Sequence, residues 1–412
     1  MGRPEPPEAV RAAVDRLAPV DLAVGLLTYN NAETIDGVLQ AVADGAARLA
    51  DTRVALIVAD AGSSDSTRER VTTSSLPAVV VEHEAPASDR INVPFHGVPG
   101  RGAALRAAFT VAHRLRARAL VLLEADAVSI TPEWIDRLAG PLLQDKADFA
   151  LAAYTRHRYE GTISRLVLGP LVRALYGRRL HYPFGGQQAL SARLVEHLLN
   201  HPKWAWRGAD VSDLWITGTA IADSFGLVEA WLGPHEIRSG TRAVDLPSMI
   251  AQTVGAAFTV MERHGDLWLE VRGSEPIVTV GEPSPPGVTP MAVEVERMME
   301  AFRQGARDLT SIWELVLAPD TLAEVLAAED GERLRFSDDL WARVIYDFAL
   351  GHHYSVVHRD HLLRSLTPLY LGRTAAFVLS TRAVDAAATQ TQLEAAAVAF
   401  ERQKTYLVEH WR

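Results

Sequence analysis

The stretch Arg118-Ala-Leu-Val-Leu-Leu-Glu-Ala-Asp-Ala-Val-Ser-Ile-Thr-Pro-Glu-Trp134 indicates how the chain folds. Its residues 119–123 are a continuous apolar run, which is typical of a strand buried on both faces of a parallel sheet. The run ends at two carboxylates, Glu124 and Asp126, at the end of the strand where open α/β sheets bind their ligands. Carboxylates at that position suit a hard divalent cation that also contacts a diphosphate. The alternative is a strand that simply ends in two solvated acids.

Strand and helix patterns alternate through the first half of the chain. Apolar runs that resemble strands span 22–28, 54–59, 79–83 and 119–123, and helix signals follow each of them. Four strand-then-helix units in succession predict an α/β fold with a doubly wound, mostly parallel sheet. Beyond residue 243 the patterns are mainly helical. We therefore expect an α/β domain over 1–242 and a helical C-terminal subdomain over 243–412.

The composition excludes several classes of function. The chain has 412 residues, no cysteine, and 41 basic against 51 acidic side chains, for a net charge of −10. This charge argues against a nucleic acid or an anionic membrane as the main partner. The lack of cysteine excludes thiol catalysis and thiolate metal sites. No run reaches the roughly 18 apolar residues of a membrane span, and the first residues lack a signal-peptide core, so we expect a soluble, cytoplasmic protein.

Three further positions are candidates for a ligand site. Asp60 ends the second strand-like run and can accept a hydrogen bond from a nucleobase, although an Asx-turn is the more ordinary explanation. The glycine-rich loop with Gly100 and Arg101 offers backbone amides and a cation to phosphate. His235 follows a later strand-like run and can supply an imidazole ligand, although a single histidine more often has a structural role.

Five segments of the chain resemble the motifs of a known family, in the same order. They are Leu27-Thr-Tyr-Asn30, Asp60-Ala-Gly-Ser-Ser-Asp-Ser-Thr67, Gly100-Arg-Gly-Ala-Ala-Leu105, Pro183-Phe-Gly-Gly-Gln187 and Gly233-Pro-His-Glu-Ile-Arg238. This series resembles GT-A fold glycosyltransferases, and among them the retaining mannosylglycerate, glucosylglycerate and glucosyl-3-phosphoglycerate synthases. The stretch Phe336-Ser-Asp-Asp-Leu-Trp341 in the helical tail is most similar to mannosylglycerate synthase. The resemblance covers nearly the whole chain and makes 1–242 the expected catalytic domain.

The resemblance also implies a role for each matching residue. The nucleotide-sugar donor would be held by Thr28, Asn30, Asp60, Gly100, Arg101, Glu124, Gly185 and Gly186. A divalent metal, Mg²⁺ or Mn²⁺, would be bound by Asp126 and His235, with Glu124 nearby. The small hydroxy-acid acceptor would be held by Arg156, Arg158, Thr162, Gln187 and Arg238. The catalytic residues would be Asp126, Asp213 and Arg238.

What the resemblance implies is a metal-dependent retaining hexosyltransferase. It would move a hexose, glucose in preference to mannose, from UDP-glucose or GDP-mannose to D-glycerate or 3-phosphoglycerate, giving a glycoside of the compatible-solute type. Attack would occur on the front face of the sugar, with the leaving phosphate taking the acceptor proton. We also expect a homodimer, because the helical tail offers an assembly surface.

Two departures from the family pattern leave alternatives open. The usual Asp-x-Asp is Glu124-Ala-Asp126 here, and Arg101 replaces a lysine, which keeps the charge but changes its geometry. One alternative is an inverting GT-A transferase that uses Asp213 as general base toward a larger acceptor. The other is a nucleotide-sugar-binding protein without turnover, which Glu124 would favour.

Overall fold

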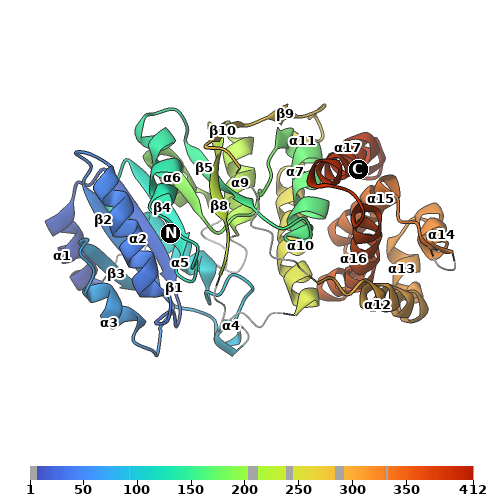
Figure 1. Ribbon diagram of the computed structural model, residues 1–412, viewed down its shortest axis with the longest axis horizontal. Helices are drawn as coiled ribbons and strands as arrows, with labels where there is room; N and C mark the ends of the chain where they lie inside the picture. The colour runs from blue at the N-terminus through green and yellow to red at the C-terminus, as the bar shows by residue number, and fades with distance from the viewer. Residues whose placement is uncertain are drawn as a thin grey trace. The chain divides into compact units, whose positions relative to one another are not determined.

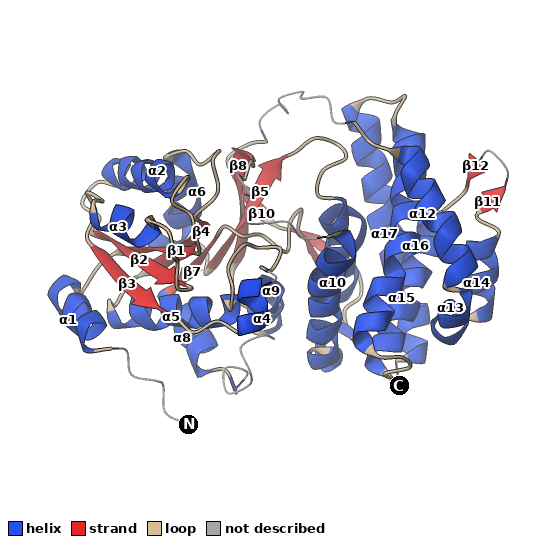
Figure 2. Ribbon diagram, turned by 90° about the horizontal axis from the view of Figure 1, so that it is seen from below, coloured by secondary structure: helices blue, strands red, loops and turns tan. Residues whose placement is uncertain are grey.

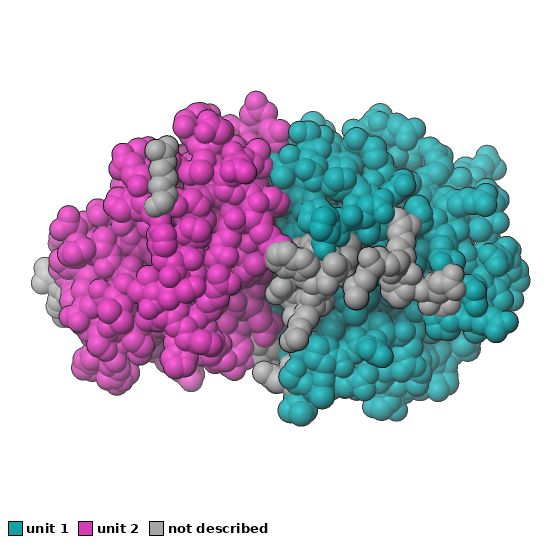
Figure 3. Space-filling model, turned by 180° about the vertical axis from the view of Figure 1, so that it is seen from behind, with its two compact units in different colours: residues 1–155, 184–244, 277–286 teal, residues 156–183, 245–276, 287–412 magenta. Residues whose placement is uncertain are grey.

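The computed structural model describes residues 7–91, 93–202, 212–237, 245–283, 292–330 and 333–411 (Figure 1). The chain divides into two compact units, coloured teal and magenta in Figure 3. Unit 1 comprises residues 1–155, 184–244 and 277–286, and unit 2 comprises residues 156–183, 245–276 and 287–412. Each unit is therefore assembled from several separate segments of the chain. The domain boundary expected between residues 242 and 243 lies outside the described residues.

Unit 1 is built on a sheet whose described strands follow the order β10-β8-β5-β7-β4-β1-β2-β3. Their neighbouring pairs are parallel, except that β7 runs antiparallel to both β4 and β5. Strands β1, β2 and β4 are buried at every position, as expected where helices cover both faces. The strands are β1 Leu22–Thr28, β2 Val54–Asp60, β3 Ala78–Glu82, β4 Ala119–Glu124, β5 Phe149–Thr155, β7 Gln188–Ser191, β8 Leu227–Pro234 and β10 Val278–Val280.

Helices lie on both faces of this sheet. Helices α2 and α6 contact each other on one face, and α5 and α8 contact each other on the opposite face (Figure 2). The helices of unit 1 are α1 Glu8–Leu17, α2 Ile35–Arg48, α3 Thr67–Thr72, α4 Ala87–Ile91, α5 Arg101–Arg114, α6 Glu133–Leu143, α8 Ala192–Asn200 and α9 Asp213–Ala222. The predicted α/β fold class is confirmed, with a large, mostly parallel sheet between two helical layers.

Strand register places the ends of several strands at one edge of the sheet. Thr28 lies opposite Asp60 in the β1–β2 pair, and Leu27 lies opposite Glu124 in the β1–β4 pair. Strand β5 runs parallel to β8 and is joined to β4 through the antiparallel β7. The carboxyl ends of β1, β2, β4, β5 and β8 therefore share this edge, where open α/β sheets bind their ligands.

Unit 2 is mainly helical, and the C-terminal region of the chain forms most of it. Helix α12 packs beside α16, and α15 packs beside α17 (Figures 1 and 2). The elements are the π-helical turn η1 Ser164–Leu168, α7 Gly169–Tyr176, β6 Arg178–Arg179, α10 Leu246–Arg263, α11 Gly265–Trp268, β9 Glu275–Pro276, α12 Val295–Asp308, α13 Thr310–Val316, α14 Pro319–Leu326, β11 Glu329–Asp330, β12 Arg333–Leu334, α15 Asp338–His353, α16 Arg359–Thr381 and α17 Ala386–His410. The predicted helical character of this region is confirmed. None of the described helices is long and apolar enough to cross a membrane.

Candidate active site

Glu124, the last residue of β4, meets two side chains from other parts of unit 1. Its Oε2 lies 3.2 Å from Nε2 of Gln187, which donates a hydrogen bond, and 3.5 Å from Nε2 of His235. A β-carbon at Gly186 would lie 2.2 Å from Oε1 of Glu124, so a larger residue there would force this carboxylate to move. Gly185, the preceding residue, is buried. Gly186 thus leaves room for the carboxylate of Glu124.

Asp126 and His235 lie on two loops that are joined by backbone contacts. Ala127 forms an antiparallel bridge with Ile237, and the amide of Val128 donates to the carbonyl of Glu236 over 2.9 Å. Asp126 is 5% exposed, so its carboxylate is held within unit 1 rather than in open solvent. The structure therefore brings together the loops of the residues that the sequence predicted as metal ligands.

The chemistry of these residues fits a hard divalent cation bound together with a diphosphate. The described residues contain no group of three or more acidic or histidine side chains already arranged around a single metal position. Mg²⁺ in nucleotide sites is typically held by one or two carboxylates plus phosphate oxygens rather than by a complete protein cage. Asp126 and Glu124 would be the carboxylates of such a site, and His235 its imidazole.

A buried ion pair lies beside this acidic group. Arg101, in the first turn of α5, donates through Nε and Nη2 to the two carboxylate oxygens of Asp213, both over 3.0 Å, and Gln188 donates to the same carboxylate. Burial raises the pKa of Asp213, against the opposing effect of Arg101, and the charge of Glu124 adds to the rise. The third guanidinium nitrogen, Nη1 of Arg101, is buried without a hydrogen-bond partner in the described part of the chain. An anion at this edge would satisfy that donor.

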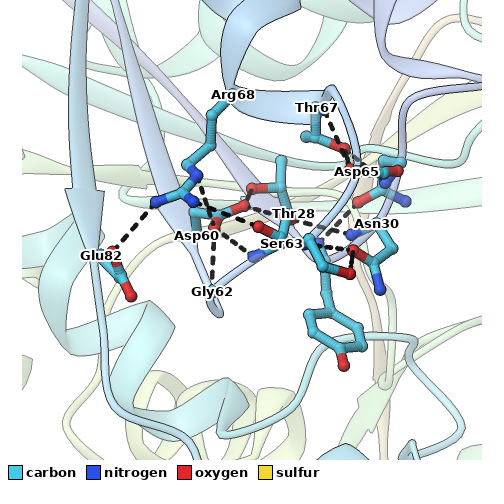
Figure 4. A network of polar contacts seen from close by, with 12 residues as sticks. Thr28, Asn30, Asp60, Gly62, Ser63, Asp65, Thr67, Arg68 and Glu82 are labelled. Atoms are coloured by element: carbon cyan, nitrogen blue, oxygen red, sulfur yellow. Dashed lines mark hydrogen bonds and ion pairs between the residues drawn. The ribbon is translucent and has the colours of Figure 1, made fainter.

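Asp60 occupies a different environment at the end of β2 (Figure 4). Its Oδ1 accepts from the backbone amides of Gly62 and Ser63, and its Oδ2 accepts from the hydroxyls of Thr28 and Ser63, over 2.6–3.0 Å. The carboxylate is fully buried. Four donors match the capacity of two carboxylate oxygens. The Asx-turn is therefore the arrangement that the structure shows, and Asp60 shapes the loop after β2.

Asn30 and Gly100 also shape loops at this edge. Asn30 has a positive φ of 53°, its side-chain oxygen accepts from the amide of Ser64 over 2.8 Å, and its own amide donates to Ser63 (Figure 4). Gly100 precedes α5 with a φ of 63°, and its amide donates to Asp89. Helix α5 begins at Arg101, so this residue belongs to the helix rather than to the glycine-rich loop in which the sequence placed it.

The predicted acceptor residues of the loop after β5 lie in unit 2. Arg158 donates through Nη1 to the carbonyls of Thr381 and Val384, at the C-terminus of α16, over 3.1 and 2.6 Å. The hydroxyl of Thr162 is hydrogen bonded to that of Tyr370, and the guanidinium of Arg156 stacks over the ring of Tyr182 at 5.2 Å. Arg158 thus caps a helix of its own unit.

Two predicted residues need separate mention. Gln187 is fully buried in unit 1, where it contacts Glu124 and Tyr154 rather than solvent. Arg238 lies outside the described residues. Sequence reasoning did not single out Tyr154 or Gln188, because both occur within strands and their polar contacts are made far along the chain.

Comparison with known proteins finds one family model that matches a segment of the chain, mostly in unit 1. Residues 23–198 match the family model described as Glycosyl transferase family 2. No curated protein matches the chain.

Among solved structures, the chain is similar to three forms of glucosyl-3-phosphoglycerate synthase from Mycobacterium tuberculosis. The form with phosphoglyceric acid is 22% identical with a TM-score of 0.44, over 62% of this chain and 83% of that chain. The form with Mn²⁺ and UDP-glucose is 22% identical with a TM-score of 0.43, over 64% and 85%. The form with Mg²⁺ and UDP is 23% identical with a TM-score of 0.43, over 64% and 86%. The match to glycosyl transferase family 2 thus covers residues 23–198 of the 412 residues in this chain.

Proposed function

We propose that the chain is a metal-dependent retaining hexosyltransferase that moves a hexose, glucose in preference to mannose, from a nucleotide sugar to D-glycerate or 3-phosphoglycerate. The observation that carries this proposal is the group formed by Glu124, the Asp126 and His235 loops, and the Arg101–Asp213 pair, at the carboxyl edge of the sheet in a glycosyl transferase family 2 domain. The choice of glucose and of a glycerate-type acceptor rests on the sequence resemblance.

The donor's diphosphate is assigned to the acidic loops and to Arg101. A bound Mg²⁺ or Mn²⁺ would offset the negative charge that builds up on the departing nucleoside diphosphate. Asp126, Glu124 and His235 would hold the cation, and Nη1 of Arg101 would donate to a phosphate oxygen. Such a donor acts strongly in a buried site because its geometry is set before the charge develops.

Asp213 has a supporting role in this proposal. Both of its oxygens accept hydrogen bonds from Arg101, and one of them also accepts from Gln188. A general base must present a free carboxylate oxygen to the acceptor hydroxyl. This geometry favours a carboxylate that orients Arg101 over the general base that the inverting alternative requires.

The acceptor anion is assigned to Arg156, with Arg238 as a second candidate. A guanidinium suits carboxylate or phosphate because it donates two parallel hydrogen bonds. Arg158 is assigned instead to the support of unit 2, because its Nη1 caps α16. Gln187 is likewise reassigned, from the acceptor to the support of Glu124.

The test is product formation from UDP-glucose and GDP-mannose, each offered D-glycerate and 3-phosphoglycerate with Mg²⁺, Mn²⁺ or EDTA. We expect an EDTA-sensitive α-glycoside, with UDP-glucose as the better donor. For a glucoside product, the anomeric proton coupling in the NMR spectrum reports retention. A β-glycoside would contradict retention and support the inverting alternative. Binding of a nucleotide sugar without product from any pair would contradict the glycerate acceptors and support a binding protein.

A further inference from the structure

Tyr154 lies at an irregularity in the sheet beside the candidate metal site. Ala153 of β5 pairs with Trp231 of β8, but Thr155 pairs with Pro234, so β8 uses three residue steps where β5 uses two. Gly233, within the longer segment, has a φ of 82°. An extra residue of this kind bends a strand and redirects the side chains near it. Tyr154 therefore sits opposite the bend that sends β8 toward His235.

The ring of Tyr154 packs on the imidazole of His235. The two rings are stacked with centroids 4.3 Å apart and planes inclined by 29°, and Tyr154 is 3% exposed. Trp134 stacks farther away, 6.4 Å from the imidazole, with its indole nitrogen donating to the carbonyl of Leu232 just before the bend. Tyr154 is thus a buried surface of the strand on which the imidazole packs.

The hydroxyl of Tyr154 reaches the same carboxylate by a second route. It donates to Oε1 of Gln187, and Nε2 of Gln187 donates to Oε2 of Glu124. Nε2 of His235 lies 3.5 Å from that same Oε2. Tyr154 thus contacts both side chains that converge on one oxygen atom of Glu124.

We propose that Tyr154 is a positioning residue of the candidate metal site, fixing the imidazole of His235 through its ring and the amide of Gln187 through its hydroxyl. The inference rests on the proposed function, because it assigns Glu124 and His235 to a divalent cation. Residues that orient metal ligands in this way typically change metal affinity by 10–100-fold when they are replaced.

The test is Mn²⁺ affinity measured by electron paramagnetic resonance of free Mn²⁺ in the presence of UDP. Tyr154→Leu removes both contacts, and we expect it to raise the Kd for Mn²⁺ about 10-fold or more. Tyr154→Phe keeps the stacking and loses only the hydroxyl, so we expect a rise of about threefold. Tyr346 provides a matched control, because it is equally buried and its hydroxyl donates to the carbonyl of Phe400 in unit 2. Tyr346→Leu and Tyr346→Phe should leave the Kd within about twofold.

The outcomes separate this inference from the proposed function. A folded Tyr154→Leu variant whose Kd for Mn²⁺ stays within about twofold of the wild type would overturn the positioning role. If Tyr154→Leu does not fold, Tyr154→Phe is the variant that tests the proposal. An unchanged Kd for Mn²⁺ in Tyr154→Phe then overturns the role of the hydroxyl. A wild-type protein that binds no Mn²⁺ in the presence of UDP would contradict the proposed function itself.

Discussion

The carboxyl ends of β2 and β4 lie at the same edge of one sheet, but their carboxylates have opposite surroundings. Asp60, at the end of β2, accepts four hydrogen bonds from its own loop and from Thr28. Glu124, at the end of β4, lies near a second buried carboxylate, Asp213, and its partner Arg101 has a buried donor with no hydrogen bond among the described residues. The donors to Asp60 thus fill both of its carboxylate oxygens, whereas an anion would satisfy the remaining donor of Arg101. A carboxylate whose oxygens are filled by its own loop serves the fold, whereas a buried cation with a spare donor is suited to bind an anion.

The largest expected effect is a loss of catalytic activity on substitution at the β4 end. Asp126→Ala removes a proposed cation ligand, so we expect kcat/KM to fall by about 1,000-fold with little change in stability. Asp145→Ala, which removes an acid with an 88% exposed side chain at the end of α6, is the matched control. A kcat/KM of Asp126→Ala within about tenfold of the wild-type value would contradict a catalytic role for the carboxyl end of β4.

The Arg101–Asp213 pair is tested through stability. Asp213→Asn leaves a guanidinium buried without its counter-charge, and we expect a loss of about 3 kcal/mol of unfolding free energy. Arg101→Met should cost a similar amount. The double variant Arg101→Met with Asp213→Asn should cost clearly less than the two losses together, because no unpaired charge remains. Urea denaturation measures all three, and additive losses would show that the two side chains are energetically independent.

The hydrogen bonds to Asp60 are tested through stability and UDP affinity. Asp60→Ala leaves two backbone amides buried without an acceptor, and we expect a loss of about 2 kcal/mol of unfolding free energy. Asp60→Asn can still accept from these amides while its NH₂ group donates to hydroxyls that rotate, so the loss should be below about 1 kcal/mol. UDP affinity of Asp60→Asn, measured by calorimetry, should stay within about threefold of the wild type. A 10-fold weaker affinity for UDP in a stable Asp60→Asn variant would instead indicate that Asp60 binds the nucleobase.

The close approach of Gly186 to Glu124 predicts a smaller loss of unfolding free energy. Gly186→Ala places a methyl group within 2.2 Å of the Glu124 carboxylate, and we expect it to cost about 1.5 kcal/mol of unfolding free energy. Glu124→Asp withdraws the carboxylate by one methylene, so Gly186→Ala should cost little in that background. Thermal and urea unfolding measure the loss of stability from Gly186→Ala in the wild type and in Glu124→Asp. Equal losses in the two proteins would show that the Glu124 carboxylate does not depend on this glycine.

The smallest expected effect is a pH dependence of stability. Burial raises the pKa of Asp213, so the folded state binds its proton more tightly than the unfolded chain does. The contribution of this group is therefore fully present below its ordinary pKa of about 3.9 and is lost as the pH rises through the raised value. The unfolding free energy of the wild type minus that of Asp213→Asn should accordingly fall as the pH increases from about 4. A difference that rises with pH would mean that Arg101 outweighs burial.

The fold was largely predictable from local patterns in unit 1. The apolar run 22–28 matches β1, and Glu124 and Asp126 stand at the end of β4 as the sequence indicated. Helix α16 shows little amphipathic pattern in the sequence, because Pro368 lies inside it and it is buried on most sides. The sequence also contains no local pattern that indicates that each unit is made of several separate segments of the chain.

The site was predictable only in part, because its deciding contacts are non-local. Arg101 and Asp213 are 112 residues apart in the chain, and Tyr154 and Gln187 are 33 apart. Motif positions indicated which residues reach the edge of the sheet. They did not indicate that Arg101 would be paired with Asp213, since pairing depends on how strands and helices pack around the edge.

The metal dependence of the nucleotide site is measured directly by calorimetric titration of UDP into the wild-type protein with Mn²⁺ and with EDTA. If the β4 edge holds a cation together with a diphosphate, the affinity for UDP should be at least about tenfold higher with Mn²⁺, and Asp126→Ala should abolish that difference. Equal UDP affinity with Mn²⁺ and EDTA in the wild type would contradict a metal-assisted nucleotide-sugar site at this edge.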